Sequence, residues 1–279
     1  MTQTWSQRLR ARATEIGHSI CLGLDPDLRR IPLIAGSVRE TLANFLRAIL
    51  EGLLDAELAP AAVKPNLAFF EQYGIDGLRA LGEVLAFVRR CGIPVVLDAK
   101  RGDIGPTQGA YARAVFDFWH ADAVTIAPYL GRDAIEPMIE RAGPARGVYL
   151  LVRTSNPSAS DLQDQILAEG EPLYQHVARW VHERFPGLGA VVGATDTSAL
   201  RQLAPILEGH PLLIPGIGTQ GGRVEEVLAA LSPAAREISL LNASSSVLYA
   251  YQRERRGDVV PAAVDAMRRL VDDAQRHVG

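Results

Sequence analysis

The chain has 279 residues, of which 48% are hydrophobic and 22% are charged, proportions that are typical of a globular protein with a large core. Its 29 Lys and Arg residues stand against 32 Asp and Glu residues, a formal net charge of −3. This balance argues against a basic field over the whole chain that would bind nucleic acid or an anionic membrane. A small anionic ligand would need a local cluster of positive charge.

The N-terminal residues contain no apolar run of signal-peptide length, and no uncharged run in the sequence reaches the roughly 18 residues of a membrane span. We therefore expect a cytoplasmic protein without a transmembrane segment. The first predicted element is a helix over residues 4–17.

Eight short runs rich in apolar and β-branched residues follow along the chain. They are almost continuously hydrophobic rather than alternating, which is typical of strands buried on both faces. In chain order they cover residues 19–25, 61–66, 93–99, 121–127, 148–154, 189–195, 212–217 and 238–243. Segments with helical periodicity separate them, such as residues 38–54, whose apolar positions are spaced by three and four.

This order of strands and helices predicts an α/β fold, the closed (β/α)8 or TIM barrel. An open doubly wound sheet is the alternative, but it usually has about five to seven strands and a glycine-rich first turn. A helix over residues 260–276 is expected to close the chain. No linker or low-complexity stretch divides the sequence, so residues 1–279 are predicted to form a single domain.

The longest predicted irregular segment covers residues 155–170, directly after the fifth strand, and is rich in Ser, Asn, Asp and Gly. Loops of this length are uncommon inside compact domains and often act as lids. We regard this segment as a candidate lid.

Charged and polar residues stand at the ends of several predicted strands, where TIM barrels carry their reactive groups. They are Asp25, Lys64, Asp98, Lys100 and Ser155. Asp98 and Lys100 are two residues apart and would point to the same side of a strand. A single one of these charges would be read as a solvated loop residue or a structural ion pair. Several at matching strand ends instead favour a catalytic site in which Lys100, flanked by carboxylates, stays protonated as an acid.

A glycine-rich stretch covers residues 215–222 (PGIGTQGG), between the seventh strand and its helix. Glycines allow backbone N–H groups to approach a phosphate, and the following helix start favours negative charge. Barrels frequently bind phosphate after strands seven and eight. A plain flexible turn is the alternative reading.

Residues 98–107 (DAKRGDIGPT) resemble the signature of the orotidine 5′-phosphate decarboxylase family in its longer bacterial form, and the D-x-K-x-x-D pattern is specific. The resemblance extends over essentially the whole chain. It includes residues 22–27 (LGLDPD), 63–66 (VKPN), 128–131 (PYLG), 153–157 (RTSNP), 193–195 (GAT) and 215–218 (PGIG).

The resemblance implies a barrel homodimer that converts orotidine 5′-monophosphate to uridine 5′-monophosphate (UMP) and carbon dioxide without a cofactor. This is the last step of de novo pyrimidine synthesis. By the same resemblance, Lys64, Asp98 and Lys100 form a charged cluster, completed by Asp103 and Thr107 from the neighbouring subunit. Each active site would then need the dimer.

The resemblance also implies roles for single residues. Lys100 would protonate C6 of the pyrimidine, and Asp98 would face the departing carboxylate. Asp25 and Lys64 would contact the ribose hydroxyls, and Ser155 the pyrimidine. The phosphate side would involve the backbone of Gly216 and Gly218 and the side chain of Gln220.

One position departs from the family pattern. An arginine on the phosphate is expected after Asn242-Ala243-Ser244, but this chain has Ser245 there. Loss of a hydrogen-bonded charge partner costs roughly 2–5 kcal/mol. Phosphate binding is therefore weaker in this chain, or another cation substitutes, for which Arg223 and Arg253 are the candidates.

Two other functions stay open from the sequence. One is a related sugar-phosphate decarboxylase or aldol-type barrel enzyme, which also uses an Asp-x-Lys strand but requires a divalent metal. The other is a barrel that binds the nucleotide but catalyses weakly. The six histidines show no metal-ligand spacing such as His-Glu-x-x-His, so no metal site is predicted.

Overall fold

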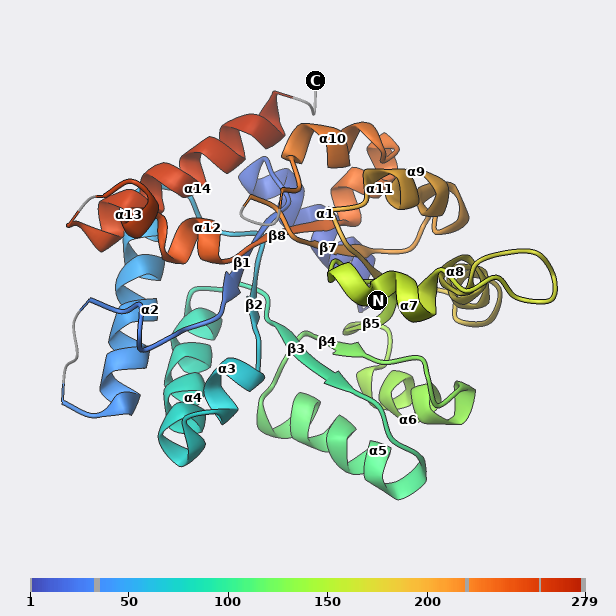
Figure 1. The fold of residues 1–279 in the computed structure, drawn as a ribbon. Coiled ribbons are helices and arrows are strands. Elements are labelled where there is room, and N and C mark those ends of the chain that lie inside the picture. The colour runs from blue at the N-terminus through green and yellow to red at the C-terminus, as the bar shows by residue number, and fades with distance from the viewer. Residues whose placement is uncertain (1, 33–35, 219–220, 256, 277–279) are drawn as a thin grey trace.

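A computed structural model describes the chain except for residues 1, 33–35, 219–220, 256 and 277–279. Its parallel strands form one sheet with the helices around it (Figure 1). The strands are β1 (Ile20–Leu24), β2 (Ala62–Pro65), β3 (Val96–Arg101), β4 (Ala123–Ile126), β5 (Gly147–Arg153), β6 (Gly189–Val192), β7 (Leu212–Pro215) and β8 (Leu240–Ala243). They pair in the order β2-β1-β8-β7-β6-β5-β4-β3.

The two ends of this order, β2 and β3, meet through isolated contacts rather than a continuous ladder. Parallel bridges join Val63 to Val95 and Asn66 to Asp98, and the backbone N–H of Val63 donates to the carbonyl of Pro94 at 2.8 Å. These contacts close the sheet into the (β/α)8 barrel that the sequence predicted.

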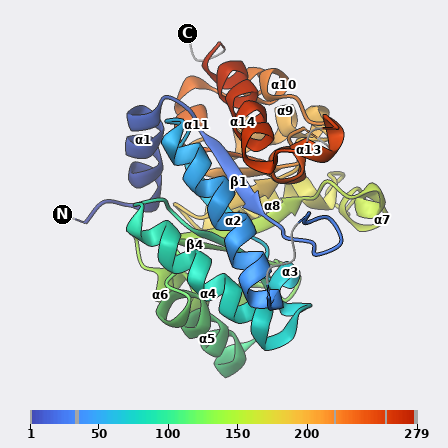
Figure 2. The same ribbon diagram turned by 90° about the vertical axis from the view of Figure 1, so that its left-hand side faces the viewer.

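The helices surround the barrel. They are α1 (Trp5–Ile16), α2 (Val38–Asp55), α3 (Ala68–Glu71), α4 (Gly74–Arg90), α5 (Gly105–Arg113), the π-helical η1 (Ala114–Phe118), α6 (Arg132–Ala142), the 3-10 turn η2 (Pro157–Ala159), α7 (Ser160–Gln163), α8 (Leu173–Arg184), α9 (Thr197–Ile206), α10 (Val224–Ala229), α11 (Pro233–Ile238), α12 (Ser245–Leu248), α13 (Ala250–Arg253) and α14 (Val259–Gln275). Helix α1 and helix α7 lie at opposite ends of the barrel (Figure 2).

The predicted terminal helices are both present, as α1 and α14. Thr4 caps α1 in a capping box with Gln7, which satisfies two otherwise unpaired N–H groups. Trp5 is buried against the strands, and its Nε1–H donates to the Tyr149 hydroxyl at 2.9 Å. A Cβ atom at Gly147 would lie 2.5 Å from Trp5 Nε1, so the glycine makes this approach possible. Helix α1 therefore closes the N-terminal end of the barrel.

All eight predicted strands overlap observed ones, because strands buried on both faces leave a continuous apolar signal. Strand β3 differs in detail from its prediction over residues 93–99. It continues to Arg101, with a register shift against β4 between Leu97 and Arg101, and Lys100 has a φ of 45°. This left-handed backbone is uncommon for a residue other than glycine. The regular alternation of a strand therefore does not describe the segment that carries Asp98 and Lys100.

The candidate lid, residues 155–170, is more ordered than the sequence suggested. It contains η2 and α7, and Ile166 forms an antiparallel bridge with Pro172 just beyond it. Within the described part of the chain, no helix is both long enough and apolar enough to cross a membrane.

Candidate active site

A cavity of about 610 Å³ opens at the carboxyl ends of the barrel strands. Its lining includes all five strand-end residues selected from the sequence: Asp25, Lys64, Asp98, Lys100 and Ser155. This is the end of the barrel at which TIM-barrel enzymes carry their active sites. The fold thus gathers residues that are up to 130 positions apart (155 − 25 = 130) around one space.

A second cavity of similar size, about 630 Å³, lies at the other end of the barrel, beside Trp5 and the carboxyl ends of α6 and α8. None of the five strand-end residues lines it. Size does not distinguish the two cavities, so we place the candidate site by its polar residues, at the carboxyl ends of the strands.

Asp98 is the centre of the charged cluster. Lys64 Nζ lies 2.9 Å from its Oδ2, and Lys100 Nζ lies 2.8 Å from its Oδ1. The side chains of Lys64 and Asp98 are 5% and 9% exposed, whereas that of Lys100 is 50% exposed. Of the two lysines, Lys100 is therefore the one that faces the open cavity. The sequence contains no lysine other than these two.

The pKa values in this cluster reflect burial and charge acting against each other. Burial disfavours the ionised form of Asp98, but the positive charges of Lys64 and Lys100 outweigh it and hold the pKa of Asp98 below its ordinary value. Burial also disfavours the charged form of Lys64, yet the carboxylates of Asp98 and Asp25 raise its pKa above the ordinary value. Asp98 and Lys64 thus remain an ion pair at neutral pH.

Thr125 fixes the geometry of this cluster and was not selected from the sequence. Its hydroxyl donates to Asp98 Oδ1 at 2.8 Å and accepts from the backbone N–H of Lys100 at 3.1 Å. The hydroxyl thereby stabilises both the carboxylate and the unusual backbone of Lys100. The available signal was a polar residue near the end of an otherwise apolar strand, β4.

Asp25 lies where the ends of β1 and β8 meet. Ser244 Oγ donates to Asp25 Oδ2 at 2.6 Å, and a Cβ atom at Gly23 would lie 2.6 Å from Ser244 Cβ, so glycine permits this approach. The second carboxylate oxygen of Asp25 and Oδ1 of Asn242 are buried, and within the described residues neither has a hydrogen-bond partner. Both residues line the cavity. Asp25 and Asn242 therefore place a carboxylate and an amide at the wall of the cavity, groups that suit a ligand with hydroxyl donors.

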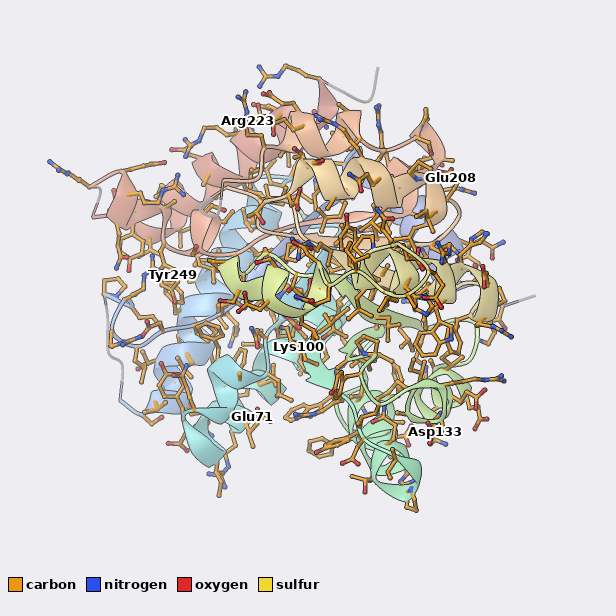
Figure 3. All side chains as sticks on the ribbon, turned by 45° about the vertical axis from the view of Figure 1, so that its right-hand side comes forward. Glu71, Lys100, Asp133, Glu208, Arg223 and Tyr249 are labelled. Carbon is orange, nitrogen blue, oxygen red and sulfur yellow. The ribbon has the colours of Figure 1, made fainter. Side chains whose placement is uncertain are left out.

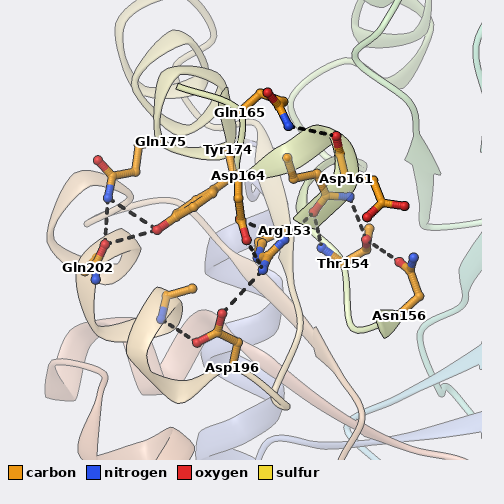
Figure 4. Close-up of polar contacts among 12 residues, drawn as sticks. Arg153, Thr154, Asn156, Asp161, Asp164, Gln165, Tyr174, Gln175, Asp196 and Gln202 are labelled. Atoms are coloured by element: carbon orange, nitrogen blue, oxygen red, sulfur yellow. Dashed lines mark hydrogen bonds and ion pairs between the residues drawn. The ribbon is translucent and has the colours of Figure 1, made fainter. Parts of the chain in front are cut away.

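Ser155 is positioned by a close contact and by the network around its neighbours. A Cβ atom at Gly193 would lie 3.0 Å from Ser155 Cβ, so this glycine lets the loops after β5 and β6 pack together. Arg153, at the end of β5, is 10% exposed and pairs with Asp164 at 3.1 Å and Asp196 at 3.5 Å (Figure 4).

Gln163 completes this network. Its Oε1 accepts from the backbone N–H of Thr154 at 3.0 Å, and its Nε2 donates to the Thr154 hydroxyl at 2.7 Å. Gln163 and Asp164 belong to the candidate lid, and Thr154 and Arg153 to the strand end. These side-chain contacts therefore attach the segment 155–170 to the end of β5, directly before Ser155.

The glycine-rich turn contributes backbone shape. Gly216 and Gly218 have φ values of 103° and 89°, which only glycine adopts freely. Gly216 lines the cavity, but Gly218 does not, and its N–H donates to the Gly222 carbonyl within the turn at 2.9 Å. Gln220 lies outside the described residues.

Ser245 lines the cavity at the first position of α12. The arginines proposed to compensate for it do not reach the site. Arg223 is 65% exposed and pairs with Glu225 on its own helix, and Figure 3 shows it at the outer edge of the molecule, with Lys100 near the centre. Arg253 is exposed on α13 and does not line the cavity. A residue next to a glycine-rich turn need not point toward it, and the sequence could not give that direction.

Arg30 is the basic residue of the cavity that the sequence did not reveal. It lies in the turn after β1, is half-buried and lines the cavity together with Tyr249 and Ser245. In the sequence Arg29 and Arg30 form an ordinary pair of loop arginines. The structure separates them, since the side chain of Arg29 is 89% exposed and paired with Asp27.

Asp103 and Thr107 do not line the cavity of their own chain. Asp103 Oδ1 accepts from the backbone N–H of Ile104 at 2.8 Å, and Thr107 is exposed in the first turn of α5. The single chain therefore does not bring these two residues to Lys100. In the described part of the chain, no group of three or more His, Cys, Asp or Glu residues could hold a metal ion.

The fold and the site together define an α/β-barrel protein with a lysine–aspartate centre at the carboxyl ends of its strands. Residues 18–257 match the orotidine 5′-phosphate decarboxylase / HUMPS family, and the chain belongs to this family.

Similar proteins share the whole barrel. The orotidine 5′-phosphate decarboxylase of Herpetosiphon aurantiacus is 44% identical over 250 residues, which cover 88% of this chain and 89% of that protein. The orotidine 5′-phosphate decarboxylase of Thermomicrobium roseum is 41% identical over 282 residues, which cover 99% of this chain and 97% of that protein. The solved structure of the Leishmania donovani OMP decarboxylase matches with a TM-score of 0.79 at 32% identity, covering 98% of this chain and 99% of that one.

Proposed function

We propose that the chain decarboxylates orotidine 5′-monophosphate to UMP and carbon dioxide in the cavity at the carboxyl ends of the strands. The observation that carries this proposal is the charged cluster, in which Lys100 extends from the buried Asp98–Lys64 pair into the open cavity. The family match and the named relatives support this reaction. It is the last step of pyrimidine synthesis, and we expect it in the cytoplasm.

The chemistry of the cluster follows from its charges. When the bond between C6 and the carboxylate breaks, carbon dioxide leaves and the electron pair stays on C6. The ammonium of Lys100 stabilises this developing negative charge and then transfers a proton to C6. Asp98, kept ionised by its two lysines, would lie beside the substrate carboxylate and disfavour it until it departs. These groups supply both the charge and the proton, so we propose that no metal or organic cofactor is needed.

The remaining residues would hold the nucleotide. We assign the carboxylate of Asp25, which lines the cavity, to the ribose hydroxyls. Lys64 would support the cluster and make a further hydroxyl contact. Ser155 would contact the pyrimidine, and the segment 155–170 would cover it as a lid. The backbone at Gly216 would face the phosphate, while Gly218 shapes the turn.

We further propose a homodimer with shared active sites. Three large apolar side chains are exposed in the loops after β3 and β4. Ile104, next to Asp103, is 56% exposed, and Tyr129 and Leu130, just before α6, are 83% and 46% exposed. Exposed apolar groups of this size favour a protein interface. A partner docked on this face would cover them and could carry Asp103 and Thr107 into the neighbouring cavity.

The test adds orotidine 5′-monophosphate to the purified chain, with and without a chelator of divalent metals, and follows the loss of substrate absorbance and the formation of UMP. Turnover that the chelator does not change supports the proposal. Turnover of a sugar phosphate that needs a divalent metal, with none of orotidine 5′-monophosphate, would instead favour the sugar-phosphate decarboxylase or aldol-type alternative. Tight UMP binding without turnover would identify a nucleotide-binding barrel.

A further inference from the structure

Among the residues that the structure describes, three basic side chains line the cavity: Lys64, Lys100 and Arg30. Both lysines contact the Asp98 carboxylate. For Arg30 the situation differs, because within the described ranges of the chain no carboxylate lies at ion-pair distance from its guanidinium. An unpaired cation at the wall of a cavity is a natural site for a ligand anion.

The direct contacts of the Arg30 guanidinium are with neutral groups, while Asp27, which is paired with Arg29, acts on it only through its charge at longer range. It lies 3.6 Å from the centre of the Tyr249 ring, a cation–π contact, and its Nε–H donates to Gln252 Oε1 at 3.0 Å. The backbone carbonyl of Arg30 accepts from the hydroxyl of Tyr251 and from Gln252 Nε2. These contacts fix the stem and one edge of the guanidinium.

The two terminal nitrogens of the Arg30 guanidinium take no part in these contacts. The structure records no acceptor for them among the residues it describes, although each carries two N–H donors. Such a planar pair of donors matches two oxygens of a phosphate. The side chain is thus ordered before a ligand binds, which reduces the entropy lost on binding.

Tyr249 connects Arg30 to the loop after β8. The backbone N–H of Tyr249 donates to the Ser245 carbonyl at 3.3 Å, and its hydroxyl accepts from the N–H of Asp27 at 2.7 Å and donates to the carbonyl of Asp25 at 3.1 Å. The loop after β1 is therefore fastened to the start of α12 and α13, beside the position where the family resemblance predicts an arginine. Arg30 approaches this wall of the cavity from the neighbouring strand.

We propose that Arg30 binds the phosphate of the nucleotide and supplies the positive charge that Ser245 does not. This inference rests on the proposed function, because it concerns the ligand of the same cavity. It assigns the substituting cation to the loop after β1 rather than to Arg223 or Arg253, neither of which lines the cavity.

The test compares the affinity of the full chain for UMP with its affinity for uridine, which lacks the phosphate. In Arg30→Ala the UMP affinity should fall by about 30- to 3,000-fold, while uridine binding stays within about twofold, a change below RT. Arg30→Lys, which keeps the charge but loses the planar pair of donors, should fall between the wild type and Arg30→Ala. A UMP-to-uridine affinity ratio in Arg30→Ala close to that of the wild type would overturn the inference.

Arg29→Ala is the matched control, because Arg29 is the adjacent arginine and is exposed. The UMP-to-uridine affinity ratio of Arg29→Ala should equal that of the wild type. If Arg223→Ala or Arg253→Ala lowers the UMP-to-uridine affinity ratio and Arg30→Ala does not, the phosphate contact belongs to that other residue instead. Adding Ser245→Arg to Arg30→Ala should restore the ratio, since position 245 lines the same cavity, and a folded double variant without restoration would contradict the assignment.

These affinities require no turnover, so the test separates this inference from the proposed function. The wild type could bind UMP far more tightly than uridine without decarboxylating orotidine 5′-monophosphate. The proposed reaction would then be refuted, while the affinities of the Arg30 variants would still test the phosphate contact.

Discussion

Lys64 Nζ lies 2.9 Å from Asp98 Oδ2, and both side chains are at least nine-tenths buried. Removal of one partner from such a pair leaves an uncompensated charge in the interior, which typically costs about 3–5 kcal/mol. The pair therefore links the chemistry of the site to the stability of the barrel.

Asp98→Asn should lower the free energy of unfolding at pH 7 by about 3 kcal/mol. The pKa of Asp98 is held below its ordinary value, so its contribution is complete above the unfolded pKa, about 3.9, and is lost as pH falls below it. The stability difference between wild type and variant should be constant from pH 7 to about 5 and shrink below about 4.

Urea unfolding at several pH values measures this difference. Asp117→Asn is the control, because Asp117 forms an exposed pair with Arg141 and should change stability by at most about 1 kcal/mol. An Asp98→Asn variant as stable as the wild type at pH 7 would show that the pair does not hold the barrel together.

Lys100→Ala should lower kcat by at least about 1,000-fold, because both the proton donor and a charge on the developing carbanion are removed. The fold should persist, since the Lys100 side chain is half exposed and Lys64 still pairs with Asp98. Single-turnover kinetics and thermal unfolding check the two statements. Arg89→Ala, an exposed cation at the end of α4, serves as the control, and near-normal turnover in Lys100→Ala would refute the assigned role.

Mixing two inactive variants tests the shared active site. Lys100→Ala and Asp103→Ala each disable every site of their own dimer. In a mixed dimer, one of the two sites combines an intact Lys100 from one subunit with an intact Asp103 from the other. Random exchange should therefore restore about one quarter of the wild-type activity.

The control for this experiment mixes Lys100→Ala with Lys64→Ala. Both residues belong to the same barrel, so no site of the mixed dimer would be intact and no activity should return. Recovery in neither mixture, with exchange of subunits demonstrated, would mean that Asp103 does not act across an interface.

Arg153→Met should loosen the candidate lid. The substitution keeps much of the aliphatic packing but removes the pairs with Asp164 and Asp196, and hydrogen bonds to charged groups contribute about 1.5–3 kcal/mol. Amide exchange in residues 157–170 should quicken by at least about tenfold. Arg146→Met, which removes a cation at the opposite end of the barrel, should leave exchange in this segment unchanged. Equal exchange in both variants would contradict the role of Arg153 as an anchor.

His18 should make the barrel sensitive to mild acid. Burial, and secondarily the charge of Arg12, lower the pKa of His18 to about 4. The unfolded chain takes up a proton below about pH 6.5 and the folded chain only near pH 4, so stability should fall by roughly 3 kcal/mol as pH drops through this window.

His18→Asn retains an acceptor for the N–H of Ile20, which bonds to His18 Nδ1, and should have a flatter pH profile. Some slope will remain, because burial also lowers the pKa of His210. Parallel profiles for wild type and variant would show that His18 does not titrate in this way.

The sequence predicted the barrel because its strands are buried on both faces and are therefore nearly continuous apolar runs. It also selected Asp98 and Lys100, which lie two residues apart at one strand end. Thr125 and Arg30 escaped prediction for a physical reason. Their roles depend on contacts across strands or between distant loops, and Arg30 gains its position only when Tyr249, 219 residues later (249 − 30 = 219), packs beneath it.

The sequence also could not predict the direction in which a single side chain points. Arg223 follows the glycine-rich turn directly, but its guanidinium pairs with Glu225 and Glu226 on its own helix. Spacing along the chain cannot distinguish a side chain that enters a cavity from one that folds back on its own helix.

The scarcity of lysine has a practical consequence. Both amine side chains of the 279-residue chain contact one carboxylate, and every other cationic side chain apart from histidine is an arginine, which reductive methylation leaves unmodified. Treatment with ¹³C-formaldehyde and a mild reductant would thus label the half-exposed Lys100 and the chain terminus, with the buried Lys64 protected. The resulting methyl resonance would report on the reactive amine of the unmutated protein, and its shift on adding UMP would follow the arrival of the nucleotide directly.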